Sequence, residues 1–99
     1  MSRNCIRNKQ LVVMGDFNAT PLEAPVQLFA KKLQCAYNNS RDTKLGPSGT
    51  FNAFNTTDPV AKRIDYIFTK NIIISHYEHL ADRRKNNLWL SDHLPVIAW

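Results

Sequence analysis

Apolar residues lie in short runs along the chain, and the spacing within each run predicts its local structure. Residues 11–14 form an apolar run with two valines that stops at Gly15, which is typical of a buried strand with polar groups at its C-terminal end. Residues 63–69 alternate from one face to the other, so we expect a second strand there. One of its faces would carry Ile64, Tyr66 and Phe68, and the other Arg63, Asp65 and Ile67.

One segment has helical spacing. Its apolar positions recur every three or four residues, at Leu22, Val26, Phe29, Ala30 and Leu33. The preceding Thr20 and Pro21 are typical of a helix start, but Pro25 has no amide proton and is tolerated only within a first turn. We therefore expect the regular helix to begin nearer Glu23 than Thr20.

The remainder of the chain alternates between loops and short strands. Polar and turn-forming residues predict loops at 38–48, 55–59 and 82–87. β-branched and aromatic residues predict strands at 50–54, 72–77 and 96–99. About five strands with one clear helix predict the α/β (α+β) class, in which helices cover a sheet.

The length and composition of the chain indicate one small domain. The chain has 99 residues, of which 43% are hydrophobic and 21% charged, enough for one core and too few for two domains. A net charge of +5 suits a polyanionic partner such as nucleic acid or a phosphorylated substrate. The Lys and Arg residues are spread along the chain, however, and fit an ordinary solvated surface equally well.

Cysteine spacing and hydropathy exclude some classes of site. Cys5 and Cys35 have neither the spacing of a zinc site nor the number expected of a disulfide framework. No stretch reaches the roughly 18 apolar residues of a membrane span, and the polar N-terminus lacks the apolar run of a signal peptide. We therefore expect no transmembrane segment.

Several side chains able to carry chemistry lie at or beside the ends of predicted strands. They are Asp16, Asn18, Asp65, Asp92 and His93. Carboxylate and amide oxygens are the ligands that Mg²⁺ and Mn²⁺ prefer, and a neighbouring histidine can act as acid, base or hydrogen-bond donor. Cleavage of a phosphate ester needs such a set, because a metal neutralises the developing charge while a base takes a proton from the attacking water.

These residues also have purely structural interpretations. Asp16 and Asn18 could be turn residues after a strand, and residues 92–93 could form the turn into the last strand. Asp65 faces inward from a strand and, as a buried carboxylate, needs a partner whatever its function. The candidate partners are Arg63, Lys62 or a histidine.

Three stretches of the sequence form a recognisable series. They are GDFNATP at residues 15–21, RIDYIF at residues 63–68 and SDHLPV at residues 91–96. In this order they resemble the C-terminal signature motifs of the endonuclease/exonuclease/phosphatase superfamily, and GTFNAF at residues 49–54 resembles a threonine-aromatic segment of many members. Three ordered motifs are a specific signal, since a given string such as GDFN arises by chance at roughly one position in 10⁵.

This resemblance implies a fold and an activity. The fold is a four-layered α/β sandwich, with two sheets face to face and helices outside, and a site for Mg²⁺ or Mn²⁺ where strand ends meet. Family members include deoxyribonucleases, abasic-site endonucleases, deadenylases, sphingomyelinases and inositol-polyphosphate phosphatases. The implied activity is hydrolysis of a phosphate ester, as a nuclease, phosphodiesterase or phosphatase.

Motif position also implies a role for each candidate. Asp16 would orient or deprotonate the attacking water and take part in the metal site, and Asn18 would hold that water or a phosphate oxygen. His93 would donate to a nonbridging phosphate oxygen, or act as base in the alternative account, with Asp65 accepting from its other ring nitrogen. Asp92 would be a metal ligand.

The family's N-terminal half supplies an early Asn, a Glu that is usually the chief metal ligand, and later a Tyr and a His. None of those motifs is identifiable in this sequence. Residues 1–99 are therefore predicted to be the C-terminal half of the domain, completed by an N-terminal half or by an oligomer. His76, Tyr77 and His79 follow the second motif and are interpreted as ordinary strand residues.

The substrate is marked only by weak signals. Phe51 is a candidate for stacking on a base, and Arg83, in the basic segment 82–87, for contact with a phosphate backbone. Packing and a solvated loop explain the same residues. Two rival hypotheses are an inactive remnant that binds nucleic acid or a partner through its basic surface, and a gene fragment that does not fold stably alone.

Overall fold

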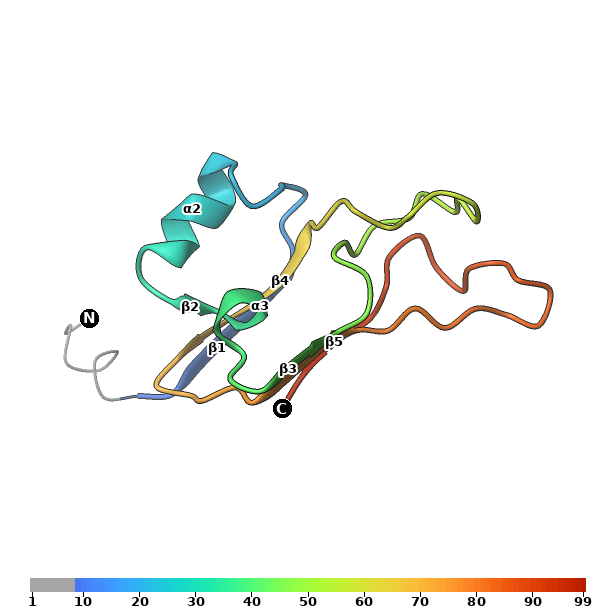
Figure 1. Cartoon of the computed structure of the whole chain (residues 1–99). Helices are drawn as coiled ribbons and strands as arrows, with labels where there is room; N and C mark the ends of the chain where they lie inside the picture. The colour runs from blue at the N-terminus through green and yellow to red at the C-terminus, as the bar shows by residue number, and fades with distance from the viewer. Residues whose placement is uncertain (1–8) are drawn as a thin grey trace.

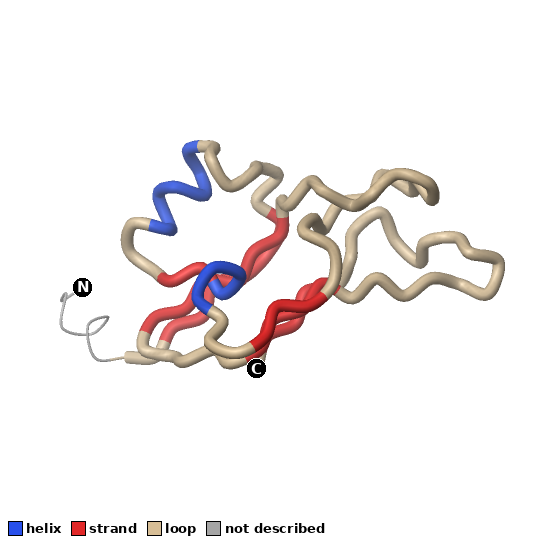
Figure 2. The backbone as a smooth tube through the Cα atoms, viewed as in Figure 1, coloured by secondary structure: helices blue, strands red, loops and turns tan. Residues whose placement is uncertain are grey.

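The computed structural model describes residues 9–99, and Cys5 lies outside them. These residues form two three-stranded sheets, one in the order β1-β4-β2 and the other β3-β5-β6 (Figure 1). The strands are β1 (Leu11–Asp16), β2 (Gln34–Cys35), β3 (Thr43–Leu45), β4 (Asp65–Lys70), β5 (His76–His79) and β6 (Val96–Ala98), and the helices are α2 (Ala24–Ala30) and α3 (Ala36–Asn39). Figure 2 shows that loops join most of these short elements.

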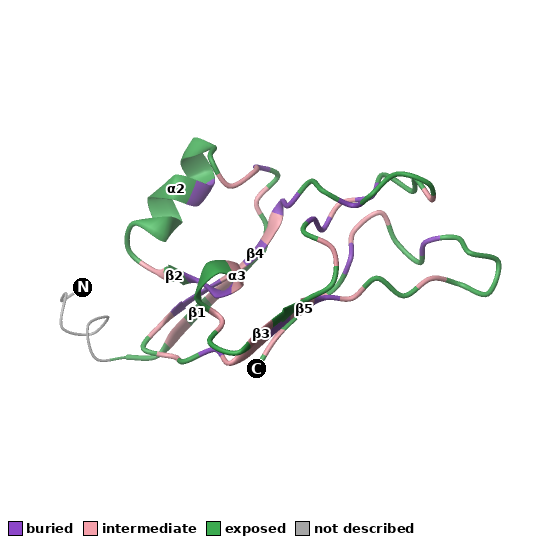
Figure 3. Cartoon of the chain, viewed as in Figure 1, coloured by how far each residue is buried: buried purple, intermediate pink, exposed green. Residues whose placement is uncertain are grey.

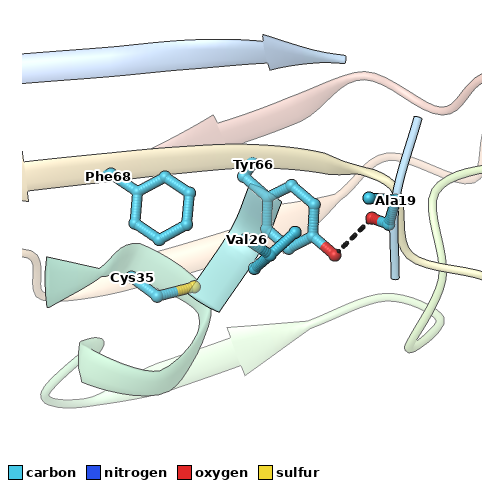
Figure 4. Close-up of a cluster of buried hydrophobic side chains, with 5 residues drawn as sticks. All are labelled: Ala19, Val26, Cys35, Tyr66 and Phe68. Atoms are coloured by element: carbon cyan, nitrogen blue, oxygen red, sulfur yellow. Dashed lines mark hydrogen bonds between the residues drawn. The ribbon is translucent and has the colours of Figure 1, made fainter. Parts of the chain in front are cut away.

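Strand β4 lies at the centre of the packing. It pairs antiparallel with β1 over its whole length and with β2 on its other side. One face of β4 buries Tyr66 and Phe68 under α2, where they meet Val26 and Cys35 (Figure 4). The other face packs through Ile67 against the second sheet. Helix α2, the first sheet and the second sheet are therefore three successive layers, as the α/β prediction requires.

Several predicted elements are confirmed. The apolar run at 11–14 is the first part of β1, the alternating segment at 63–69 covers all of β4 except its last residue, and the final apolar segment contains β6. Helix α2 has Glu23 as its N-cap and places Pro25 in the first turn, where a missing amide proton costs no hydrogen bond. The Glu23 carboxylate accepts hydrogen bonds from the backbone N–H and the hydroxyl of Thr20, and these bonds lower its pKa.

Two predictions about the first sheet and its helix are wrong. Strand β1 is not buried, because it is paired on one side only within residues 9–99 and its second face is largely open. Leu22 does not face the core but is 90% exposed, since the helix begins after it. Figure 3 shows α2 exposed along nearly its whole length, and its one buried residue is Val26.

The second sheet also differs from its prediction. The expected loop at 38–48 contains the end of α3 and the strand β3, which pairs in parallel with β5. The strand expected at 72–77 begins only at His76, because residues 72–74 cross from one sheet to the other. The segment 50–54 forms no regular strand and contributes single bridges through Phe51.

The described chain is extended, and it leaves apolar sheet edges open. Its Cα radius of gyration is 14.9 Å, compared with about 13 Å for a compact domain of 100 residues. The exposed apolar side chains on β1 and at β6 are Val12 (45%), Met14 (67%), Ile97 (43%) and Trp99 (54%). The loop between β5 and β6 extends well beyond the strand ends (Figure 1). Neither described helix is long and apolar enough to span a membrane.

Candidate active site

The ends of β1 and β4 place two carboxylates opposite each other. In the antiparallel register Asp16 is the partner of Asp65. Like charges directly opposite in a sheet are destabilising, so a cation or a proton donor between the two carboxylates stabilises this pair. His93 supplies one from the loop before β6: its Nδ1 lies 2.8 Å from Asp65 Oδ2 and its Nε2 lies 3.8 Å from Asp16 Oδ2.

The contact with Asp65 fixes the protonation of His93. An ionised carboxylate can only accept hydrogen bonds, so Nδ1 of the ring must donate to Asp65. This hydrogen bond raises the pKa of His93 above its ordinary value, partial burial opposes the rise, and the nearby negative charges of Asp65, Asp92 and Asp16 add to it. The imidazolium form is therefore favoured, and its Nε2–H faces the side of Asp16.

The turn after β1 holds Asp16 in place. Its central residue, Phe17, donates its backbone N–H to the Ile64 carbonyl at 2.8 Å, and its ring packs 5.2 Å from that of Tyr66. Asn18 follows in the left-handed region at φ 48°, which Asn tolerates better than most residues. The Asn18 N–H donates to Asp16 Oδ1 at 2.7 Å. One carboxylate oxygen of Asp16 is thus fixed by the turn, and the other faces His93.

Buried contacts anchor the turn and the histidine loop on either side of the site. The Tyr66 hydroxyl lies 2.8 Å from the Ala19 carbonyl oxygen, as the dashed line in Figure 4 marks, and burial raises the pKa of Tyr66 to about 12. Leu94, next to His93, is buried against Val60 and Trp89. Ala19, three residues after Asp16, and Leu94, directly after His93, are therefore both held in core clusters.

The donor atoms in this region fit a hard divalent cation with few protein ligands. Ligand atoms of Asp16, Asp65 and His93 lie within 4.8 Å of one another. Within this group Asp65 and His93 are engaged with each other, which leaves the oxygens of Asp16. Asp92, the other predicted ligand, is not among these three residues; it is half-buried beside His93, and its negative charge acts on that ring. Mg²⁺ commonly binds through one or two carboxylates together with waters and substrate phosphate oxygens. The exposed carboxylate of Asp16 is consistent with that preference.

The two predicted substrate contacts lie in different surroundings. The ring of Phe51 meets the ring of His93 edge to face at 5.2 Å, so Phe51 borders the cluster. Arg83 lies 4.2 Å over the ring of Trp89 and donates to the Thr56 carbonyl at 3.0 Å. The guanidinium of Arg83 therefore packs within the long loop between β5 and β6 and joins that loop to the loop at 55–59. Nothing in these contacts joins it to the cluster.

Two polar side chains at the site carry no assigned role from the sequence. Thr50 and Asn52 are buried and make hydrogen bonds to the segments that carry Asp65 and His93. A buried polar residue in a loop has no periodic pattern to mark it. The only sequence signal was the position of both residues in the GTFNAF segment.

The fold and the strand-end cluster together define a class of protein, and comparison with known families gives the same class. A family model described as the Endonuclease/Exonuclease/phosphatase family matches residues 2–93. The chain belongs to this family, which confirms the resemblance found in its motifs. Among curated proteins, none matches the chain.

Solved structures share the fold. A conserved protein of unknown function from Enterococcus faecalis V583 is 37% identical with a TM-score of 0.83, covering 91% of this chain and 35% of that one. A family protein from Bacteroides thetaiotaomicron is 30% identical (TM-score 0.78; 91% and 36%), and a mannosyl-6-phosphatase from B. thetaiotaomicron VPI-5482 is 28% identical (0.78; 91% and 37%). The chain thus spans little more than a third of the structures it matches.

Proposed function

We propose that the protein hydrolyses phosphate esters with the help of Mg²⁺ or Mn²⁺ at the cluster of Asp16, Asp65 and His93. The observation that carries this proposal is the placement of His93 between two opposed carboxylates, with one ring nitrogen bound and the other facing Asp16. Family membership and the similarity to a mannosyl-6-phosphatase support phosphate esters as the substrate class.

The geometry allows a division of work between Asp16 and His93. Their nearest oxygen and nitrogen atoms are 3.8 Å apart, too far for a direct hydrogen bond, so an oxygen atom of water or phosphate can contact both groups. Asp16 orients or deprotonates the attacking water, and Asn18 holds this water or a phosphate oxygen. His93 donates from Nε2 to a nonbridging phosphate oxygen, and the raised pKa favours this role over that of a base.

Asp16 and Asp92 are the residues that would hold the cation. When bound, the cation supplies positive charge that neutralises the phosphate group as its negative charge develops. Asp65 works through His93, because it fixes the tautomer and orientation of the ring.

We further propose that residues 1–99 form the C-terminal part of the catalytic domain and work together with an N-terminal half or another chain. Three observations support this: the extended shape, the exposed apolar residues on β1 and β6, and the small share of each matched structure that the chain covers. Apolar edges of this kind are normally covered in a folded protein.

The choice of substrate within the class rests on Phe51 and the basic surface. A group bound at His93 Nε2 would lie beside the ring of Phe51, which could contact a base or another flat substituent. Arg83 stays a prediction for backbone phosphate, and its engagement with Trp89 means that the loop would have to rearrange to release it. Nucleic acid is therefore one candidate substrate among phosphate esters.

The proposal is tested by hydrolysis of bis(p-nitrophenyl) phosphate with Mg²⁺ or Mn²⁺, then with a chelator. We expect His93→Ala to abolish any metal-dependent turnover, whereas His76→Ala, a substitution in β5 away from the cluster, should leave it unchanged. Turnover that survives His93→Ala would contradict the proposal. Salt-sensitive binding of nucleic acid with no metal dependence and no turnover from the folded chain would favour the inactive remnant instead.

A further inference from the structure

One buried threonine joins the two segments on which the candidate pair depends. Thr50 is fully buried, and its Oγ1 accepts the backbone N–H of Ile64 at 3.0 Å and of Asp65 at 3.2 Å. These two N–H groups lie at the start of β4, where Asp65 projects toward His93. A hydroxyl oxygen has two acceptor positions, and here both are used on the segment that carries Asp65.

The backbone of Thr50 also binds the loop that bears His93. The Thr50 carbonyl accepts the N–H of Leu94, the residue after His93, at 2.6 Å. The Thr50 N–H donates to the Lys62 carbonyl at 2.9 Å. Thr50 therefore links the strand that bears Asp65 to the loop that bears His93, although the two residues are 28 positions apart in sequence.

Neighbouring residues reinforce this link on the His93 side. The Asn52 backbone N–H donates to the Asp92 carbonyl at 2.8 Å, and its side-chain amide donates to the Ser91 carbonyl at 3.0 Å. Phe51 bridges both Lys62 and His93. In this short stretch the Thr50 side chain is the group that binds the Ile64 and Asp65 amides. Removing its oxygen should therefore loosen Asp65 selectively, while the backbone bonds of Thr50 and Phe51 to the Lys62 carbonyl remain.

We propose that Thr50 is a positioning residue that sets the Asp65–His93 hydrogen bond through its side-chain oxygen. This inference rests on the proposed function for its catalytic meaning, but the geometry can be tested without activity. Thr50 touches no reacting group. It acts by fixing the position of the Asp65 carboxylate relative to the His93 ring. A displacement of about 1 Å in such a pair can reduce turnover about 100-fold.

The chain offers a matched control on β4. Thr69 is also buried, and among the described residues its Oγ1 finds no hydrogen-bond partner. Thr50→Val and Thr69→Val therefore make the same chemical change, a hydroxyl replaced by a methyl group, at a bonded and an unbonded position. Thr50→Ser keeps the oxygen and removes the methyl group, so it separates the hydrogen bonds from the packing.

The experiment is NMR of the 99-residue chain and the three variants at a fixed pH, observing the His93 ring Nδ1–H signal and the exchange of backbone amides. We expect Thr50→Val to lose the hydrogen-bonded Nδ1–H signal and to speed exchange of the Asp65 amide about tenfold or more relative to that of Phe68 in mid-strand. Thr50→Ser and Thr69→Val should both keep the signal.

The same spectra decide against the inference in two ways. An Nδ1–H signal that persists in Thr50→Val overturns it, and so does a signal lost in folded Thr50→Ser, because packing rather than the oxygen would then be responsible. The signal pattern expected above, found together with no metal-dependent turnover in any variant, would support the positioning role and show that residues 1–99 alone do not carry out the proposed hydrolysis. If turnover is present, Thr50→Val should lower kcat with little change in KM.

Discussion

Two regions of the molecule differ in how completely their side chains are held. One is the end of the first sheet where the carboxylates meet, and the other is the outer sides of β1 and β6. At the carboxylate end, the polar groups are fixed from several directions: Asn18 and His93 donate hydrogen bonds to the carboxylates, and Thr50 accepts one from the backbone of Ile64, directly before β4. On the outer sides, Met14 and Trp99 expose more than half of their surface. The comparison shows that contacts within this chain are enough to fix the polar groups of the site, whereas the chain covers its own apolar surface only in part.

The strongest test of this contrast replaces a phenylalanine in each environment. Phe68 is fully buried between β4 and α2, so Phe68→Ala should lower the free energy of unfolding by about 3–5 kcal/mol. Phe54 is 61% exposed, so Phe54→Ala should change it by less than about 0.5 kcal/mol. Urea unfolding followed by circular dichroism measures both. Equal losses in the two variants would mean that the packing around β4 is not the core.

At the carboxylate end, the next largest effect is expected from Asp65→Asn. The asparagine keeps the shape but removes the charge that favours the imidazolium, so the pKa of His93 should fall toward 6.5. In the metal-dependent assay, turnover should fall about 10- to 100-fold, as for other residues that orient a catalytic histidine. NMR titration of the ring and rate measurements check the two effects. Asp58→Asn, in the loop 55–59, is the control and should alter neither.

A buried histidine in the second sheet predicts a pH dependence of stability. His79 Nδ1 lies 2.7 Å from the Pro47 carbonyl oxygen and must donate to it, so Nε2 accepts from the Tyr77 hydroxyl, also at 2.7 Å. Burial lowers the pKa of His79 below its ordinary value of 6.5. The unfolded chain therefore binds a proton below about pH 6.5 that the native state resists, and stability should fall as the pH drops through that value.

The expected slope is up to about 1.4 kcal/mol per pH unit for one proton. Urea unfolding at pH 7.5 and pH 5.5 measures it, and His79→Phe should remove this part of the slope. His93 acts with the opposite sign, since its raised pKa stabilises the native state at low pH and this contribution is lost as the pH rises through the native value. His93→Ala should therefore steepen the loss in acid, and a shallower loss would contradict these assignments.

The smallest effect on stability is expected at the open sheet edges. Met14→Lys and Ile97→Lys place charges on exposed strand positions and should change the free energy of unfolding by less than about 0.5 kcal/mol. They should nevertheless reduce self-association at high protein concentration, because charged residues on an edge oppose strand pairing. Sedimentation velocity and urea unfolding test the two effects. A loss above about 2 kcal/mol would show that these side chains are packed within the chain itself.

The sequence predicted the parts of the fold that depend on side-chain pattern. The alternation of Ile64, Tyr66 and Phe68 matches three buried positions, and the helix begins next to Glu23 as Pro25 requires. Strand β3 was missed because it is held by backbone pairing with β5 and has no apolar alternation of its own. The apolar run in β1 suggested burial on both faces, which this chain does not provide.

For the site, motif order placed Asp16, Asp65 and His93 at strand ends, and the structure brings their side chains together. Their catalytic roles stay predictions. What sequence could not supply was the register that sets Asp16 opposite Asp65, or the hydrogen bonds of Thr50 between distant segments. Both depend on how the chain is brought together in three dimensions, which residue spacing does not encode.

The central proposal is that Asp16 and Asp92 hold a divalent cation beside His93. It is tested most directly by titrating the labelled chain with Mn²⁺ and recording the paramagnetic broadening of each amide signal. We predict selective broadening at Asp16, Asn18 and Asp92, which disappears in Asp16→Asn and is retained in Asp58→Asn. Broadening that is uniform over the chain, or that is unchanged in Asp16→Asn, would contradict the account.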